Sequence, residues 1–240
     1  MKLDWKKIKE GFHPSWHPYM KEVMESKEVW EIFQTLKTST EVVTPKSQNL
    51  FKSFEVDLDH MSVLIMGQDP YPQVDMSGHK ANGIAFDCRN YGGISMSLEK
   101  LYEAMEDDAY NGLNLMYDLK NPDLSYLMNQ GVMLTNSSLT CTKNRADAHK
   151  GLWTPFWKLV FNKCFAHKTG LIFIFMGNRA KELIDFTLDI HHVLSCEHPV
   201  AAAYAKRKMN HNNVFSRANE LLLKMNNFKM CWLLDEDVPF

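Results

Sequence analysis

Four short apolar runs recur along the chain, and each ends abruptly in polar residues. The runs cover residues 63–66, 131–135, 171–176 and 192–196. Wholly apolar runs of this length are typical of strands that are buried on both faces, as in a parallel sheet. Helical segments between them favour parallel strands whose carboxyl ends share one edge. We therefore predict an α/β fold with a central four-stranded parallel sheet flanked by helices, and residues 1–240 as a single domain.

Apolar residues at helical spacing predict the segments that connect these strands. Ser26 precedes such a pattern and can cap a helix over residues 26–37. Thr154-Pro155 and Ser216 have the composition of helix starts. Further helices are expected at residues 48–56, with Phe51 and Phe54 facing inward, and at 95–107, 122–130, 154–167, 178–188 and 216–226.

The first apolar run leads into Gly67-Gln68-Asp69-Pro70-Tyr71-Pro72. Each proline lacks an amide donor and fixes φ, so neither can continue a central strand. Asp69 and Tyr71 should therefore lie on a stiff loop at the carboxyl edge, where open α/β sheets bind ligands. Taken alone, this loop is better explained as a proline turn in which Asp69 bonds to nearby backbone.

Similar polar residues follow the other three runs. Asn136, Asn178 and His198 each stand at or just beyond a predicted strand end. Together with Asp69, these side chains would converge on one crevice at the shared edge. An acid, two amides and an imidazole in one crevice indicate an active site rather than four separate turns.

The overall charge of the chain is slightly negative. The formal net charge is −2 and the isoelectric point is near 6.5, which argues against a general polyanion binder. Basic residues nevertheless gather after two of the predicted strand ends. Either cluster alone is typical of a solvated face, but the two together favour phosphate contacts. The clusters comprise Lys143, Arg145, His149 and Lys150, and Lys206, Arg207, Lys208, His211 and Arg217.

The cysteines and the N-terminal residues indicate a compartment. Five cysteines without a C-x-x-C pair suit reduced thiols in a cytosolic protein. No apolar run approaches the ~20 residues that span a bilayer, and no signal-peptide pattern follows Met1. We expect a cytoplasmic protein (nuclear, or in the host-cell cytoplasm, if it is viral) that is not secreted. His13 and His17 have metal-site spacing, but Pro14 and Pro18 break the helix that would align them, so no metal site is expected.

Four sequence blocks together resemble a known family. Residues 67–71, 83–86, 134–140 and 198–199 match the signature blocks of the family 1 uracil-DNA glycosylases in content, order and spacing, and the similarity covers nearly the whole chain. The resemblance implies the fold of that family. It also implies a monofunctional hydrolase that excises uracil from DNA, leaving an abasic site in base-excision repair.

The resemblance implies roles for four residues that bind the base. An enzyme that acts on a base must take it out of the stack and recognise it in a pocket. Asn136 would recognise uracil, since its amide has one acceptor and two donors for N3–H and O4. Phe86 would stack on the uracil ring, and Tyr71 would exclude the methyl group of thymine at C5. Gln68 would contribute to the pocket.

By the same resemblance, two residues would perform the chemistry. An anionic Asp69 would stabilise the positive charge that develops on the sugar and would orient or deprotonate the attacking water. His198 would donate a hydrogen bond to uracil O2 and stabilise the departing anion. A neutral imidazole suffices if backbone fixes its other nitrogen. No metal or organic cofactor is implied.

The chain departs from the family pattern where DNA would be gripped. Pro72 replaces a usual histidine, residues 93–98 lack the usual paired prolines, and Asn178 replaces a usual serine. Contacts with phosphates are still expected from the loops concerned. The residues predicted to bind DNA are Ser97, Asn178, Ala202, Tyr204, Lys206 and Arg207.

The most consequential departure is Ala202, which stands where the family normally has a leucine that enters the duplex. A methyl group cannot fill the gap left by a flipped base, and unstacking costs least in single strands. We therefore predict a preference for single-stranded uracil-DNA. Equal activity on both substrates would instead point to Tyr204 or Met209 as the wedge.

Three functional hypotheses remain open at this stage. The first, an active glycosylase, is favoured because every catalytic residue type is present. The second is a DNA-binding or replication-tethering protein with reduced or lost catalysis, supported only by the altered loops. The third, a nucleotide-dependent α/β enzyme, lacks both G-x-G-x-x-G and G-x-x-x-x-G-K-[ST]. A DNA-mimicking inhibitor protein would dock on the same basic rim, and a monomer is the default.

Overall fold

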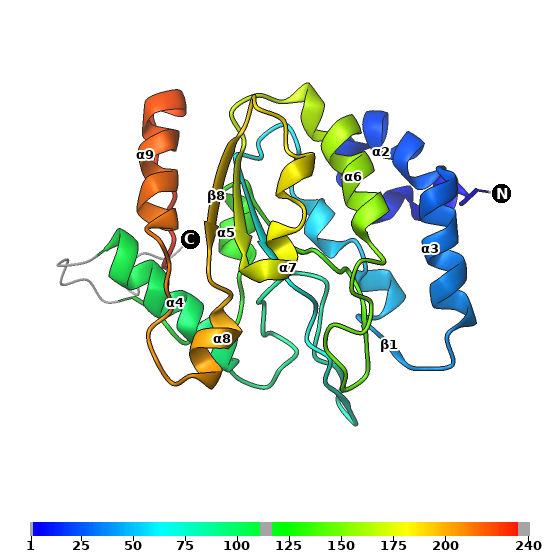
Figure 1. Cartoon of the computed structure of the whole chain (residues 1–240), viewed down its shortest axis with the longest axis horizontal. Helices are drawn as coiled ribbons and strands as arrows, with labels where there is room; N and C mark the ends of the chain where they lie inside the picture. Colours follow the sequence, from blue (N-terminus) through cyan, green and yellow to red (C-terminus); the bar gives the residue numbers. More distant parts are fainter. Residues whose placement is uncertain (1, 111–116, 235–240) are drawn as a thin grey trace.

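A parallel sheet runs through the middle of the molecule, with helices against both of its faces (Figure 1). The computed structural model describes residues 2–110 and 117–234. The strands of the sheet are β2 (Val63–Gly67), β5 (Val132–Asn136), β7 (Ile172–Met176) and β8 (His192–Cys196). They lie in the order β5-β2-β7-β8, and every neighbouring pair is parallel. The predicted α/β fold with a four-stranded parallel sheet is confirmed.

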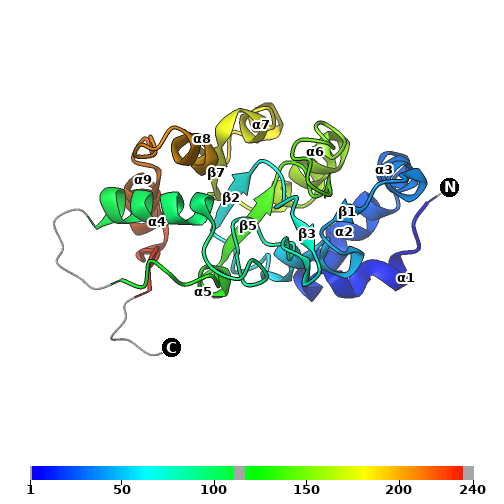
Figure 2. The same ribbon diagram turned by 90° about the horizontal axis from the view of Figure 1, so that it is seen from below.

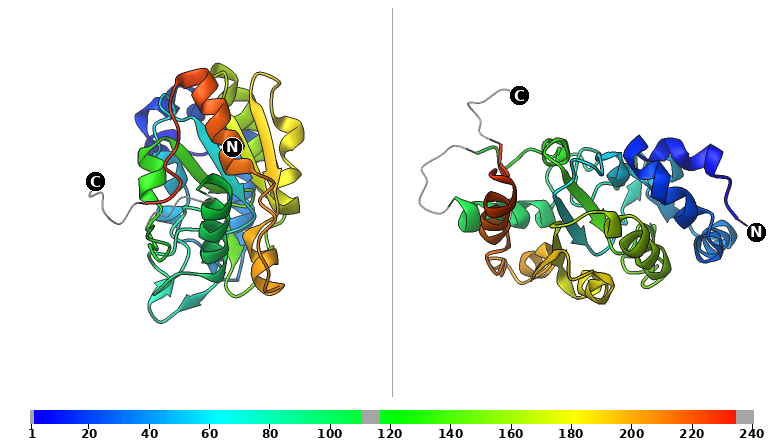
Figure 3. Two further views of the ribbon diagram at one scale, coloured as in Figure 1. Left: turned by 90° about the vertical axis from the view of Figure 1, so that its left-hand side faces the viewer. Right: turned by 90° about the horizontal axis from the view of Figure 1, so that it is seen from above.

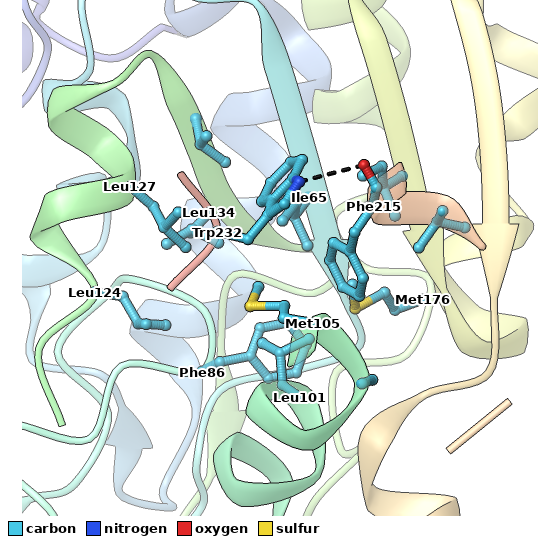
Figure 4. Close-up of a cluster of buried hydrophobic side chains, with 14 of the residues drawn as sticks. Ile65, Phe86, Leu101, Met105, Leu124, Leu127, Leu134, Met176, Phe215 and Trp232 are labelled. Carbon is cyan, nitrogen blue, oxygen red and sulfur yellow. Dashed lines mark hydrogen bonds between the residues drawn. The ribbon is translucent and has the colours of Figure 1, made fainter. Parts of the chain in front are cut away.

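Side chains that alternate along each strand divide the core between the two faces of the sheet. In β2, Ile65 belongs to the cluster on one face and Leu64 to the cluster on the other, and both are fully buried. Figure 4 shows the first cluster, to which Ile65, Trp232 and Phe215 belong. The indole N–H of Trp232 donates to the Phe215 carbonyl at 3.2 Å, so this buried polar group has a partner.

Helices cover both faces of the sheet. The first face is covered by α4 (Met96–Ala109), α5 (Ser125–Asn129) and α9 (Val214–Asn226), and the second by α2 (His17–Met24), α3 (Lys27–Thr38) and α6 (Thr154–Lys163). Figures 1 and 3 show α9 and α3 at opposite ends of the molecule. In the described part of the chain, no helix is both long and apolar enough to cross a membrane.

Shorter elements connect this frame. They are the helices α1 (Trp5–Ile8), α7 (Gly177–Lys181) and α8 (Pro199–Tyr204), the antiparallel pairs β1 (Val43–Thr44) with β6 (Cys141–Thr142) and β3 (Val74–Asp75) with β4 (Gly78–His79), and 3₁₀ helices at Lys9–Gly11, Pro14–Trp16, Ser47–Asn49, Lys52–Glu55, Phe165–His167 and Ile184–Phe186.

Two of the three predicted helix starts are confirmed. The Ser26 hydroxyl caps α3 by accepting from the Val29 N–H at 3.2 Å, and α6 begins at Thr154. The predicted start at Ser216 is wrong, because α9 begins at Val214. Buried Phe51 and Phe54 face inward as expected, although residues around them form two 3₁₀ helices rather than one α-helix.

Three other predicted helices are too long. The segment 178–188 is α-helical only as far as Lys181, the last residue of α7, and then continues through a turn into the 3₁₀ helix Ile184–Phe186. The segment 122–130 begins with turns in which the Asp123 side chain accepts from the Ser125 N–H at 2.8 Å, which competes with helix. The segment 154–167 continues past α6 only as a 3₁₀ turn.

The carboxyl ends of the four strands meet at one edge of the sheet, which Figure 2 views from below. The chain leaves β2 towards β5 on one side, whereas it leaves β7 towards β8 on the other. Loops that diverge in this way open a crevice between neighbouring strands, and ligands bind in such crevices. The helix α8 and the β3–β4 hairpin lie along this edge (Figures 1 and 2).

Candidate active site

The loops that follow β2 and β5 are tied together by hydrogen bonds. The Ser137 N–H donates to the Gly67 carbonyl at 3.0 Å, and the Ser138 N–H donates to the Gln68 carbonyl at 2.9 Å. The Ser137 hydroxyl adds a second bond to Gln68 at 2.9 Å. The sheet ladder therefore continues beyond the strand ends and holds both loops in register.

Two glycines allow side chains to close over the strand ends. A Cβ on Gly67 would lie 2.6 Å from Asn136 Oδ1 and 3.0 Å from a ring carbon of Phe86. A Cβ on Gly177, which has a φ of +82°, would lie 2.7 Å from the His198 Cβ. Neither approach leaves room for a side chain. Both glycines stand in the sequence motifs, but only the tertiary structure gives the reason.

Phe86 sits in the left-handed region with a φ of 66°, which is unusual for a bulky residue. Its neighbour Asp87 is fully buried and accepts from the Leu124 N–H at 3.0 Å and from the amide of Asn82. These bonds hold the loop, and the Phe86 ring centroid lies 5.5 Å from that of His198. Asn82 and Asp87 support the site, and the sequence patterns did not single them out.

Asp69 is held by a backbone donor from a distant loop. The Asp147 N–H donates to Asp69 Oδ2 at 2.7 Å. Burial raises the pKa of Asp69 above its ordinary value, and the Asp147 carboxylate adds to this. The hydrogen bond from Asp147 and the guanidinium of Arg179 act in the opposite direction. Burial therefore favours the protonated form of Asp69, whereas these two contacts favour the anion.

Asp147 is in turn fixed by an ion pair. Its carboxylate accepts from Arg179 Nη2 at 2.7 Å and Nε at 3.2 Å. Asp147 has a φ of 59°, a conformation in which aspartate is tolerated better than most residues. Arg179 lies in the first turn of α7 and also bonds to Glu182. No local pattern marks Asp147 or Arg179 as part of the site.

His198 is partly buried, with one ring nitrogen bound to backbone. The Val200 N–H donates to His198 Nδ1 at 3.2 Å, so the proton of the neutral ring lies on Nε2. Burial lowers the pKa of His198 to about 4. At neutral pH the imidazole is therefore uncharged and has a proton to donate from Nε2.

These side chains surround a single cavity of about 340 Å³. Its lining includes all six residues predicted to act in catalysis or to bind substrate, namely Gln68, Asp69, Tyr71, Phe86, Asn136 and His198. Ser97 and Tyr204 border the same cavity. Within the described part of the chain, no three His, Cys, Asp or Glu residues are arranged to hold a metal ion.

Asn178 does not join this cavity. It lines a neighbouring hollow of about 710 Å³ together with Lys181 and Arg207, and the two hollows share Gln68 and His198 as a common wall. The predicted convergence is therefore correct for Asp69, Asn136 and His198, whereas Asn178 lies in the adjoining basic hollow.

The residues predicted to bind DNA differ in exposure. Tyr204 is 77% exposed and Lys206 is exposed. Arg207 is exposed too, but its guanidinium pairs with the Glu197 carboxylate at 2.8 Å. Ala202 is fully buried because residues 199–204 form α8, which packs against α4. The prediction that Ala202 faces DNA is wrong, and Met209, also buried, offers no wedge either.

Comparison with known proteins identifies the family. Residues 54–223 match the family model of the Uracil DNA glycosylase superfamily. The chain is 34% identical over 228 residues to the uracil-DNA glycosylase of Streptococcus equi subsp. zooepidemicus, covering 92% of this chain and 99% of the relative. It is 28% identical over 225 residues to that of Francisella tularensis subsp. holarctica, covering 90% and 93%. The chain therefore belongs to the uracil-DNA glycosylase superfamily.

Solved structures agree in fold. The mimivirus uracil-DNA glycosylase superposes with a TM-score of 0.80 at 22% identity, over 96% of this chain and 90% of that chain. The UNG of Nitratifractor salsuginis has a TM-score of 0.64 at 18% identity, over 98% and 100%. A variant of the mimivirus protein, solved in complex with UGI, gives 0.81 at 22% identity over 96% and 91%.

Proposed function

We propose that this protein is a uracil-DNA glycosylase that hydrolyses the N-glycosidic bond of a flipped-out deoxyuridine and leaves an abasic site for base-excision repair. The family and the named relatives support this activity. The observation that carries the proposal is one cavity with a partly buried carboxylate, Asp69, and a neutral imidazole, His198, whose Nε2 carries the proton. Such a pair suits a reaction that separates charge in both directions.

The residues that line this cavity recognise the base. The Asn136 amide pairs with N3–H and O4 of uracil, and cytosine presents the wrong pattern there. Phe86 stacks on the ring, and Tyr71 stands against C5, where thymine carries a methyl group. Gln68 completes the wall that the cavity shares with the basic hollow.

The chemical step needs no group beyond these side chains and water. The bond between N1 and C1′ breaks, and its electron pair leaves with the base. Anionic Asp69 stabilises the cationic sugar and takes a proton from the water whose oxygen bonds to C1′. The His198 Nε2–H donates to uracil O2 and stabilises the uracil anion, which then takes a proton from solvent.

DNA would bind along the carboxyl edge. Ser97 borders the cavity, Asn178 lines the basic hollow, and exposed Lys206 follows the end of α8; we expect all three to contact phosphates. Arg207 would have to exchange its pairing with Glu197 for a phosphate. Tyr204 is the exposed aromatic side chain at the rim.

We extend the proposal to the form of the substrate and to partners. Because Ala202 is buried in α8, it cannot enter a duplex, and single-stranded uracil-DNA should be the better substrate. A DNA-mimicking inhibitor protein would dock on the same edge; a structural neighbour is solved in complex with UGI. We propose a monomer that acts in the compartment that holds the DNA.

The test is excision from oligonucleotides that carry one uracil, single- and double-stranded, with a chelator present and alkali to reveal abasic sites. The wild type should release uracil. The Asp69→Asn and Asn136→Ala variants should each lose at least about 100-fold in single-turnover rate, since they remove the charge and the base recognition respectively.

Asp189→Asn is the matched control, because it removes the same charge from an exposed turn before β8, at the opposite edge of the sheet. It should retain the wild-type rate. If well-folded wild-type protein makes no abasic site in either substrate, the enzymatic proposal fails. DNA binding without excision would then favour a DNA-tethering role.

A further inference from the structure

The hydroxyl of Tyr71 lies in a chain of hydrogen bonds. The Leu98 N–H donates to Ser95 Oγ at 3.1 Å, and Ser95 Oγ lies 2.7 Å from the Tyr71 hydroxyl oxygen. Tyr71 donates to the Phe86 carbonyl at 3.0 Å. A carbonyl can only accept, so Tyr71 uses its one proton on Phe86 and the hydroxyl of Ser95 must donate to Tyr71.

A buried thiol, that of Cys88, also contacts the Tyr71 hydroxyl. Cys88 Sγ lies 3.3 Å from the Tyr71 hydroxyl oxygen and donates to the Phe86 carbonyl at 3.3 Å. The Ser95 N–H donates to Cys88 Sγ at 3.4 Å. Thiols are weak hydrogen-bonding groups, so Ser95 supplies the one strong donor to Tyr71. Ser95 is 4% exposed and Cys88 is fully buried.

These contacts join two walls of the cavity to the start of α4. Tyr71 provides one wall and Phe86 another, and the tyrosine hydroxyl bonds to the phenylalanine backbone. Ser95 is the N-cap of α4 and bonds to both that helix and Tyr71. Burial raises the pKa of Tyr71, so the hydroxyl keeps its proton at any physiological pH.

We propose that Ser95 is a positioning residue that fixes the Tyr71 ring and thereby sets which substituents at C5 of the base the cavity admits. This inference rests on the proposed uracil excision. A pocket side chain excludes a base that carries one extra methyl group only if the side chain is held rigidly. Such discrimination between substrates is modest, about 10- to 200-fold. Without the serine hydroxyl, Tyr71 keeps only its bond to Phe86 and a weak thiol contact.

The substrates concerned are uracils substituted at C5. The experiment measures single-turnover excision from single-stranded oligonucleotides that carry uracil, thymine or 5-hydroxymethyluracil. In Ser95→Ala, the ratio of the uracil rate to the rate for each substituted base should fall about tenfold, the factor expected from loss of one hydrogen bond. Ser95→Thr keeps a hydroxyl and should restore the wild-type ratio.

Tyr71→Phe tests the same contact from its other end. It keeps the ring but removes the hydroxyl, so its ratio should fall as in Ser95→Ala. Because both substitutions break one contact, the double variant should fall no further than either single variant.

Ser26→Ala is the matched control. Ser26 caps α3 as Ser95 caps α4, with its Oγ 3.2 Å from the Val29 N–H, and it lies far from the cavity in the chain. Both serine-to-alanine variants lose a helix cap, and thermal unfolding should report a similar loss of stability in each. Only Ser95→Ala should change the ratio between bases.

An unchanged ratio in folded Ser95→Ala, or an equal loss on every base, would mean that Ser95 only caps α4 and would overturn the inference. If Ser95→Ala fails to fold, an unchanged ratio in Tyr71→Phe overturns it. Wild-type protein that releases no uracil would overturn the proposed function itself, and this inference with it.

Discussion

Burial acts in opposite directions on the two residues proposed for the chemistry. It raises the pKa of Asp69 and lowers that of His198 to about 4, because a buried site disfavours either charged form. The neutral form is what His198 needs, whereas Asp69 must ionise. The contacts that favour the anion, the Asp147 N–H and the Arg179 guanidinium, therefore matter for activity at mildly acidic pH.

Substitutions in the Asp147–Arg179 pair should move the acid limb of the pH profile in opposite directions. Activity requires anionic Asp69, so it falls as the pH drops through the pKa of that carboxyl. Arg179→Ala removes a positive charge that lowers this pKa, so the limb should move to higher pH. Asp147→Asn removes a negative charge that raises it, and the limb should move down.

The measurement is the single-turnover rate on single-stranded substrate across the pH range, at saturating enzyme. Asn also tolerates the left-handed backbone at position 147, and it keeps the N–H that bonds to Asp69. The double variant should lie between the single variants. Identical acid limbs in all of these proteins would show that the pair has no electrostatic effect on Asp69.

Helix ends show how far local sequence rules extend. Ser26 and Ser95 cap α3 and α4 with their own hydroxyls, as N-cap serines do. The start of α9 is different, because Asn213 is in the left-handed region and gives no side-chain cap. Asp108, at the end of α4, instead accepts from the Phe215 N–H at 2.8 Å and from the Ser216 N–H at 3.3 Å.

Asp108→Ala should lower the free energy of unfolding by about 3 kcal/mol, because buried N–H groups of α9 lose their acceptor. The Asp108 side chain is 1% exposed. Its neighbour Asp107 is 37% exposed and pairs with Lys208, so Asp107→Ala should cost less than about 1 kcal/mol. Urea denaturation measures both, and equal losses would contradict a capping role for Asp108.

The molecule presents its site at one edge of the sheet, and the surroundings decide which DNA reaches it. Helix α8 turns Ala202 into the core and leaves Tyr204 outside, at the rim of the cavity. The net charge of −2 means that attraction to DNA must come from local groups, such as those of the basic hollow.

Wild-type protein should excise uracil faster from single strands than from duplexes. If Tyr204 stacks in the space that a flipped base leaves in a duplex, Tyr204→Ala should increase the ratio of the single-strand rate to the duplex rate about tenfold, the effect of losing one aromatic stacking contact. Tyr204→Phe keeps the ring and should behave as the wild type. Parallel rate measurements on both substrates provide the test. Equal wild-type rates would refute the single-strand preference, and an unaltered ratio in Tyr204→Ala would exclude Tyr204 as the stacking residue.

The sequence by itself determined the sheet and the residues at its edge. Four apolar runs indicated buried strands, and prolines and polar residues after them marked where the chain must leave the sheet. Asp69, Asn136 and His198 follow directly from this pattern, because strand direction alone brings their loops to one edge. Burial of a strand requires an apolar run, and the end of a strand favours proline and polar residues, so both features can be predicted from the local sequence.

The tertiary structure decided which partners these residues have. The contacts of Asp69 with Asp147, of Tyr71 with Ser95, and of Asp108 with α9 join residues that are distant in the chain. Ala202 was placed wrongly for the same reason, since a helix that packs against α4 buries it. A hydrogen bond or a tertiary contact leaves no periodic pattern in either partner's sequence, so only the folded chain shows it.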